Sequence, residues 1–127
     1  MGKKTYTIDG AKFTTLAEFA EEFSRVCLAG YQWKGNLDAF NDILYGGFGT
    51  PDEGFRLVWK NAALSKNNLG YEETVKWYKE TLQRCHPSNI PLLRERKALA
   101  QQGRGQTLFE WIIDIIKNHH DIELALE

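Results

Sequence analysis

The sequence is poor in the residues that cross-link or interrupt a chain. Its 127 residues include three prolines and two cysteines, Cys27 and Cys85. A disulfide between the two is possible, but two buried thiols in a reducing cytoplasm are the expected state. Neither cysteine stands at the spacing of a metal-ligating motif. The cysteine content therefore argues against a disulfide-stapled scaffold and against a cysteine-based zinc module.

Long apolar runs and a strong charge of one sign are also absent. No apolar run approaches the roughly 18–20 residues that a membrane span needs. No apolar segment follows Lys3 and Lys4, as a secretory signal would require, so a cytoplasmic location is expected. The 16 basic and 17 acidic residues give a net charge of -1, which argues against a general nucleic-acid binder.

The usual signatures of catalysis are missing as well. The sequence has no GxSxG elbow and no GxGxxG or Walker-type loop, since the GGFG of residues 46–49 lacks the lysine and the spacing. Its only cysteine and histidine clusters are Cys85-His86 and His119-His120. Adjacent histidines before a strand are more typical of a helix end than of a metal site. We therefore expect no enzyme activity, no cofactor and no metal.

The apolar pattern that is present predicts a single α/β domain over residues 1–127. Hydrophobic residues make up 43% of the chain and aromatics 13%, enough for a core. Helical stripes follow Thr15 and Asn36, two candidate N-caps, and recur over 71–85, 91–103 and 108–115. The last stripe is expected to bury Leu108, Trp111, Ile112 and Ile115. Short strands are expected at 5–8, 55–60 and 121–127. Strands separated by helices favour a small three-stranded parallel sheet packed by helices.

Charge is unevenly distributed along the chain. Residues 31–55 carry one basic and four acidic side chains, a net of -3. Residues 76–104 carry seven basic and two acidic side chains, a net of +5. The basic segment is interpreted first as a solvated helix face, and alternatively as a surface for RNA or a protein partner.

The stretch QWKGNLDAFNDILYGG, residues 32–47, places two acids on one helix face. With Asn36 as the N-cap, Asp38, Asp42 and Tyr45 lie at i, i+4 and i+7 and share a stripe. Composition alone favours a solvated face. The alternatives are acids directed at a basic partner, or an acid/base pair. An exposed helix is a poor place for acid/base catalysis, because neither pKa would be shifted far.

The segment NLDAFNDIL (36–44), with Trp33 before it and Gly46 after it, resembles the signature of the barstar family. The order of the surrounding elements also resembles that family over residues 5–66 and 106–127. The resemblance implies a three-stranded parallel sheet packed by helices. It also implies an intracellular inhibitor that inserts this helix and the preceding loop into a ribonuclease active site. Residues 67–105 are then an insertion relative to the short members of the family.

By position, the resemblance implies a set of partner-binding residues. Asp42 matches the dominant acidic contact, Asp38 and Asp114 match further acidic contacts, Asn36 the helix start and Trp33 the loop aromatic. Lys34 stands where the family usually has glycine, Asn41 replaces a tryptophan, and Tyr45 lies at the end of the acidic stripe. Gln32, Lys34 and Asn41, where the sequence departs from the family, are expected to set the target, a basic extracellular-type or toxin ribonuclease. An immunity protein against a delivered nuclease toxin, and an interaction module that uses the basic segment, are the alternatives.

Overall fold

The sheet is parallel and has its middle strand where the sequence predicts it. The computed structural model describes residues 3–127. In strand order, the sheet consists of β1 (Lys4–Asp9), β2 (Phe55–Lys60) and β3 (Ile122–Leu126). Tyr6 of β1 and Leu124 of β3 both stand opposite Leu57 in the central strand. Parallel neighbours need long crossover connections, and here helices supply them. The predicted α/β class with a small parallel sheet is confirmed.

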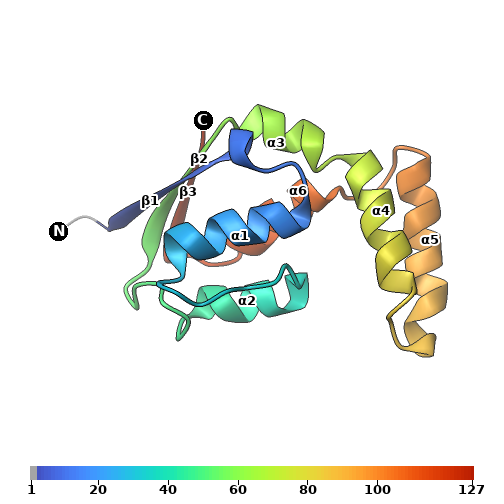
Figure 1. Ribbon diagram of the computed structural model, residues 1–127, viewed down its shortest axis with the longest axis horizontal. Coiled ribbons are helices and arrows are strands. Elements are labelled where there is room, and N and C mark those ends of the chain that lie inside the picture. Colours follow the sequence, from blue (N-terminus) through green and yellow to red (C-terminus); the bar gives the residue numbers. More distant parts are fainter. Residues whose placement is uncertain (1–2) are drawn as a thin grey trace.

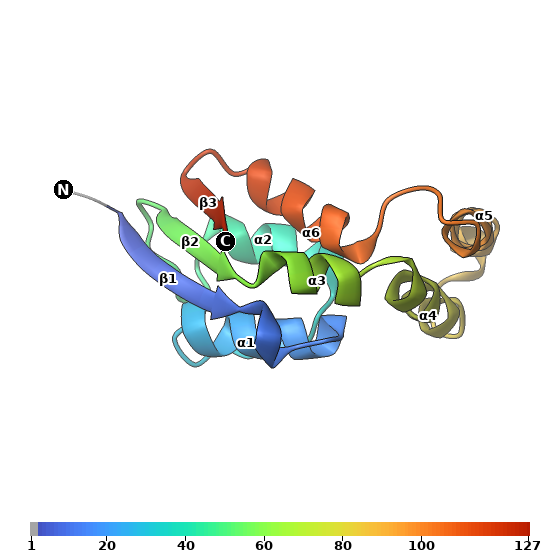
Figure 2. The ribbon, with the colours of Figure 1, turned by 90° about the horizontal axis from the view of Figure 1, so that it is seen from above.

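Helices α1, α2 and α6 lie on one side of this sheet (Figures 1 and 2). Their bounds are Leu16–Cys27, Leu37–Tyr45 and Leu108–Lys117, respectively. Side chains alternate between the two faces of a strand, so Phe55, Leu57 and Trp59 of β2 share one face, and all three are buried in the core. The ring of Trp59 stacks on Phe19 of α1 at a centroid distance of 5.2 Å. The core therefore fills the space between the sheet and these helices.

The buried face of α6 is turned relative to the predicted one. Leu108 and Ile112 are buried as expected, but the other buried members are Phe109, Ile113 and Ile116. Trp111, predicted to be a core residue, is only partly buried and packs edge-on against Trp77. The prediction was wrong because the apolar side of LFEWIIDIIK is wider than the face that the core buries. Glu110, Asp114 and Lys117 form the single exposed polar stripe, and the buried face is the part of the apolar side that lies opposite it.

Helix α3 (Ala62–Asn68) was not predicted at all. It begins after Asn61, which adopts the left-handed conformation with φ of 55°. Its buried members are the small residues Ala62 and Ser65, and the Ser65 hydroxyl accepts a hydrogen bond of 3.0 Å from Trp59 Nε1. A helix held by small side chains has no apolar stripe that periodicity could detect.

Residues 71–101 form a helical hairpin that projects beyond the core (Figures 1 and 2). It consists of α4 (Tyr71–Leu82), a short 3-10 turn (Pro87–Asn89) and α5 (Ile90–Gln101). The hairpin is fixed at its base, where the Leu108 amide donates to Thr74 Oγ1 at 2.9 Å. The predicted insertion thus docks on the core instead of hanging from a linker. Among the described residues, no helix combines the length and the apolar character that crossing a bilayer requires.

Candidate partner-binding surface

Asn36 starts α2 as predicted. Its side-chain Oδ1 accepts hydrogen bonds from the backbone amides of Asp38 at 2.9 Å and Ala39 at 3.4 Å. These amides have no acceptor inside the helix, so the cap satisfies two groups that would otherwise need water. The cap also fixes the direction in which the first turn, with Asp38, leaves the loop.

Trp33 does not lie on the surface. It is 4% exposed and stacks on Phe40 of α2 at a centroid distance of 4.6 Å. Its backbone amide donates to Ser24 Oγ of α1, and its indole Nε1 donates to the Asn36 carbonyl, both at 2.9 Å. The expectation that the Trp33 ring itself forms part of the binding face therefore has no support in this arrangement. Trp33 instead joins the loop to both helices.

The outer face of α2 is acidic and open to solvent. Leu37, Phe40 and Leu44, the predicted inner stripe, are all buried, and Ile43 joins them. Asp38, Asp42 and Tyr45 are exposed, as is Lys34 in the preceding loop. We call these four residues the acidic face. Neither aspartate forms an ion pair within residues 3–127, where the ion pairs are Arg25–Glu22 and Arg56–Glu123. Both carboxylates are thus available to a partner.

Asn41 is held from the buried side of α2 by a histidine, His119, whose position in the sequence indicates only a helix end. The Asn41 side chain is half-buried, and its Oδ1 lies 2.8 Å from Nε2 of His119, just after α6. His119 is 5% exposed. Its ring also makes an edge contact with Tyr45, at a centroid distance of 4.6 Å. Burial lowers the pKa of His119, and the charge of Asp121 opposes that shift. His119 therefore fixes the second half of α2 to the corner between α6 and β3.

Asp114 is exposed, but the side chain to which it is hydrogen-bonded does not lie on α2. Its carboxylate binds the side-chain amide of Gln106 in the loop that leads into α6. Glu110, one turn earlier, is used in the capping box of Thr107 at the start of the same helix. No hydrogen bond or ion pair in residues 3–127 connects Asp114 to the acidic face. The structure thus brings Asn36, Asp38, Asn41, Asp42 and Tyr45 together on one helix, and places Asp114 on another.

Two aromatic side chains, one from the loop before α2 and one from the loop after it, contact each other. Tyr31, from the loop before α2, and Phe48, from the loop after it, lie with ring centroids 4.9 Å apart. Tyr31 is 46% exposed and Tyr45 is 76% exposed. Tyrosines exposed beside charges are frequent at protein interfaces. Neither Tyr31 nor Phe48 was predicted to bind a partner, because an aromatic residue in a loop more often belongs to the core.

Within residues 3–127, the thiols and the potential metal ligands form no site. Cys27 and Cys85 are both free, Cys27 buried and Cys85 half-buried. Burial is the main cause of a strongly raised pKa of the Cys27 thiol, and the charge of Glu22 adds to it. Such a thiol is unreactive at neutral pH. Over residues 3–127, no three histidine, cysteine, aspartate or glutamate side chains gather as metal ligands would.

A model of the family described as Barstar (barnase inhibitor) matches residues 3–109 of the chain. The matched range contains α2 and the helical hairpin, and it ends in the first turn of α6. The status of residues 67–105 as an insertion relative to shorter members stays a prediction. No curated protein matches the chain.

Proposed function

The chain belongs to the Barstar family, and from that premise we propose that it binds and blocks the active site of a barnase-type ribonuclease through the acidic face of α2. The observation that carries this proposal is the exposure of Asp38 and Asp42 on a helix whose opposite side is buried. A ribonuclease cleft concentrates positive charge because it binds phosphates. Two carboxylates that form no ion pair within residues 3–127 suit that cleft.

Rigidity supports the same proposal. The N-cap at Asn36, the Trp33 stack and the Asn41–His119 hydrogen bond hold α2 at its start and in its middle. A surface that is already ordered loses little conformational entropy on binding, so more of the charge-pair energy is retained as affinity. Electrostatic attraction between the acidic face and a basic cleft would also speed the encounter. In this proposal Trp33 and Asn41 support the acidic face from its buried side, and Lys34 and Tyr45 form its rim.

The binding kinetics of single-acid variants test the proposal. The Asp42→Ala and Asp38→Ala variants would be compared with wild type for binding to purified barnase and for inhibition of RNA cleavage. Removing one partner of a desolvated charge pair costs about 2 kcal/mol or more. We therefore expect Asp42→Ala to raise the off-rate at least about 30-fold. The on-rate should change far less, because one exposed charge contributes only part of the steering field.

A matched control separates the effect of removing these two aspartates from the effect of changing the overall charge. Glu80→Ala removes an exposed carboxylate of α4, and it should leave the off-rate unchanged. If both aspartate variants dissociate as slowly as wild type from a nuclease that the wild type inhibits, the assignment to this face is wrong. If the wild type fails to inhibit any ribonuclease in a panel of basic enzymes, the inhibitory function itself is wrong.

The exposed Lys34 motivates a narrower form of the proposal. A basic side chain at the rim of an acidic face would clash with some basic nucleases and favour others. The target is then a specific nuclease, such as a toxin delivered by a competing bacterium, and the chain serves as its immunity protein. A nuclease module encoded in the neighbouring reading frame, and inhibited more strongly than barnase, would support this form. An unrelated neighbour would count against it.

A further inference from the structure

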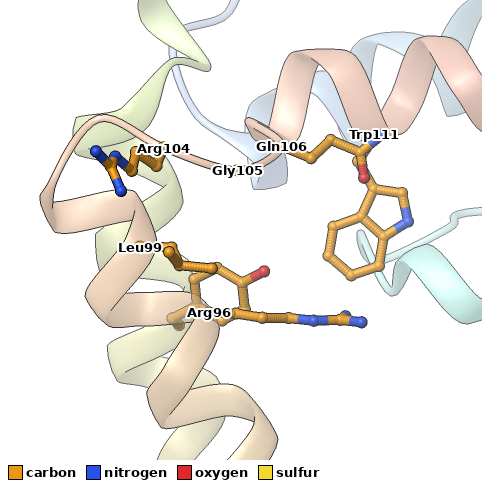
Figure 3. Close-up of a pocket in the computed structure, with 7 residues that line it drawn as sticks. Arg96, Leu99, Arg104, Gly105, Gln106 and Trp111 are labelled. Carbon is orange, nitrogen blue, oxygen red and sulfur yellow. The ribbon is translucent and has the colours of Figure 1, made fainter.

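The cleft between the helical hairpin and α6 does not gather its polar groups around one point. It has a volume of about 430 Å³, and its lining includes Arg96, Arg104 and Trp111. Figure 3 shows the guanidinium groups of Arg96 and Arg104 pointing to opposite sides. A small-ligand site needs polar groups that converge on the ligand, so this cleft identifies none. Side chains do converge at the corner between α2 and α6, around His119.

His119 contacts two side chains of α2 at once. Its Nε2 lies 2.8 Å from Oδ1 of Asn41, and its ring meets the ring of Tyr45 edge-on with centroids 4.6 Å apart. Asn41 and Tyr45 are four residues apart, so they are neighbours on the helix surface, along the edge of the acidic face. His119 itself is buried, and close packing leaves such a ring little freedom to turn. The two side chains that it contacts are therefore held in place.

The contact with His119 uses only one end of the Asn41 amide. Because Oδ1 can only accept, Nε2 of His119 donates, and the Nδ2 group of Asn41 is left to bind another acceptor. This group donates no hydrogen bond within residues 3–127. It is not a buried atom either, since these residues contain no buried polar side-chain atom without a partner. Two N–H donors of fixed direction therefore reach solvent directly beside Asp42.

We propose that Asn41, oriented by His119, selects a partner that presents an acceptor oxygen next to the cations that bind Asp42. The inference rests on the proposed function and deepens it by naming a feature of the nuclease. A cleft with cations alone would satisfy Asp38 and Asp42 but leave the Asn41 donors unpaired, which weakens binding once water is excluded. A backbone carbonyl or a carboxylate of the nuclease can supply the acceptor. His119 is then a positioning residue, and Tyr45, which contacts the same ring, lies beside the contact.

The Asn41→Asp variant separates hydrogen bonding from charge. It keeps the shape of the side chain and an acceptor for His119, but it exchanges both donors for a third negative charge beside Asp38 and Asp42. If the acidic face recognised charge alone, this variant would bind a basic ribonuclease more tightly than wild type. We expect the opposite, an off-rate raised about tenfold, which corresponds to the loss of one interfacial hydrogen bond. Binding kinetics would be measured with barnase and with the enzyme of a panel of basic ribonucleases that the wild type inhibits best.

Two salt concentrations distinguish the sources of the acceptor. If Asn41 faces a carboxylate of the nuclease, the Asn41→Asp variant should lose more affinity at about 50 mM than at about 300 mM salt, because salt screens the repulsion. If Asn41 faces a carbonyl, the loss should be the same at both concentrations. Either result supports the inference. The His120→Gln variant, at the exposed neighbour of His119, is the control and should dissociate at the wild-type rate.

The positioning role of His119 is tested separately. Nitrogen NMR of the unbound protein at neutral pH should show the His119 ring protonated at Nε2. The His119→Phe variant keeps a ring against Tyr45 but no donor, and it should raise the off-rate about threefold or more. In the His119→Gln variant an amide can donate to Asn41 instead, so most of the affinity should return.

Several results would overturn the inference. A His119 ring protonated at Nδ1 alone would mean that the Asn41 amide is reversed and offers no donor to the partner. A His119→Phe variant that dissociates like wild type would remove the positioning role. An Asn41→Asp variant that dissociates as slowly as wild type, or more slowly, would mean that no acceptor faces Asn41. In these cases a faster release of the Asp42→Ala variant would still support the proposed function, whereas a wild type that inhibits no ribonuclease would remove both.

Discussion

The hydrogen bond between Asn41 and His119 should contribute measurably to the stability of the fold. Asn41 Oδ1 can only accept, so His119 Nε2 carries the proton in this pair. The Asn41→Ala variant leaves that N–H without its acceptor, at a position where the histidine is only 5% exposed to solvent. A buried donor without an acceptor costs about 1–3 kcal/mol. The free energy of unfolding should fall by that amount, a large share of the roughly 5–15 kcal/mol that small domains have.

A double-mutant cycle isolates the pair from its surroundings. The single variants Asn41→Ala and His119→Ala and the double variant would be unfolded in urea, with tryptophan fluorescence as the signal. We expect a coupling energy of about 1 kcal/mol, the usual net value of a hydrogen bond between side chains. Asn118→Ala, at an exposed position next to His119, serves as the control and should change stability by less than about 0.5 kcal/mol.

Two results would refute this reasoning. A coupling energy below about 0.3 kcal/mol would mean that the two side chains act independently. An Asn41→Ala variant as stable as wild type would mean that water replaces the lost acceptor. Either result would also remove the support that this contact gives to a rigid acidic face.

Two further predictions concern the same helix. Burial lowers the pKa of His119, so below the unfolded value of about 6.5 the unfolded chain binds more protons than the folded one. The free energy of unfolding should therefore fall from pH 7.5 to pH 5.5, and a His119→Gln variant with an equally steep fall would contradict this. Asn36→Ala should cost about 1 kcal/mol in urea unfolding, because Asn36 caps two amides of α2, while Asn36→Asp should retain most of the stability. Equal losses in the two Asn36 variants would contradict the capping role.

The elements that the sequence predicts best are those with a local chemical signal. Thr15 and Asn36 cap α1 and α2 as expected, because the hydroxyl and the amide act within three residues of themselves. Strand β2 has its predicted bounds, since turn residues precede it and large apolar side chains fill it. Helix α3 gives no such signal. The orientation of α6 depends on its neighbours, because its apolar side is wider than the face that the core buries.

The residues of the candidate site also divide into those that a local signal predicts and those whose contacts depend on distant parts of the chain. Exposure of Asp38 and Asp42 could be predicted, because a buried stripe on α2 leaves the opposite stripe outside. The partners of Trp33 and Asn41 could not be predicted. Trp33 contacts α1 and α2 together, and Asn41 meets a histidine 78 positions away. A polar or aromatic residue beside a recognised motif can face a partner or the core, and only the long-range packing decides between them.

The distribution of charge has a consequence for how a basic nuclease would approach. The N-terminal end of α2, with Asp38, points toward the side on which the helical hairpin projects (Figure 1). Residues 76–104 carry a net of +5, against -3 for residues 31–55. A basic nuclease is therefore attracted by the acidic face and repelled by the helical hairpin. Exposed charges act over about 8–10 Å at physiological salt, a range that covers the final approach. The hairpin would then disfavour orientations that bring the nuclease against residues 76–104 and favour those centred on Asp42. Its positive charge would thereby make binding more selective for the acidic face, although the hairpin is not part of that face.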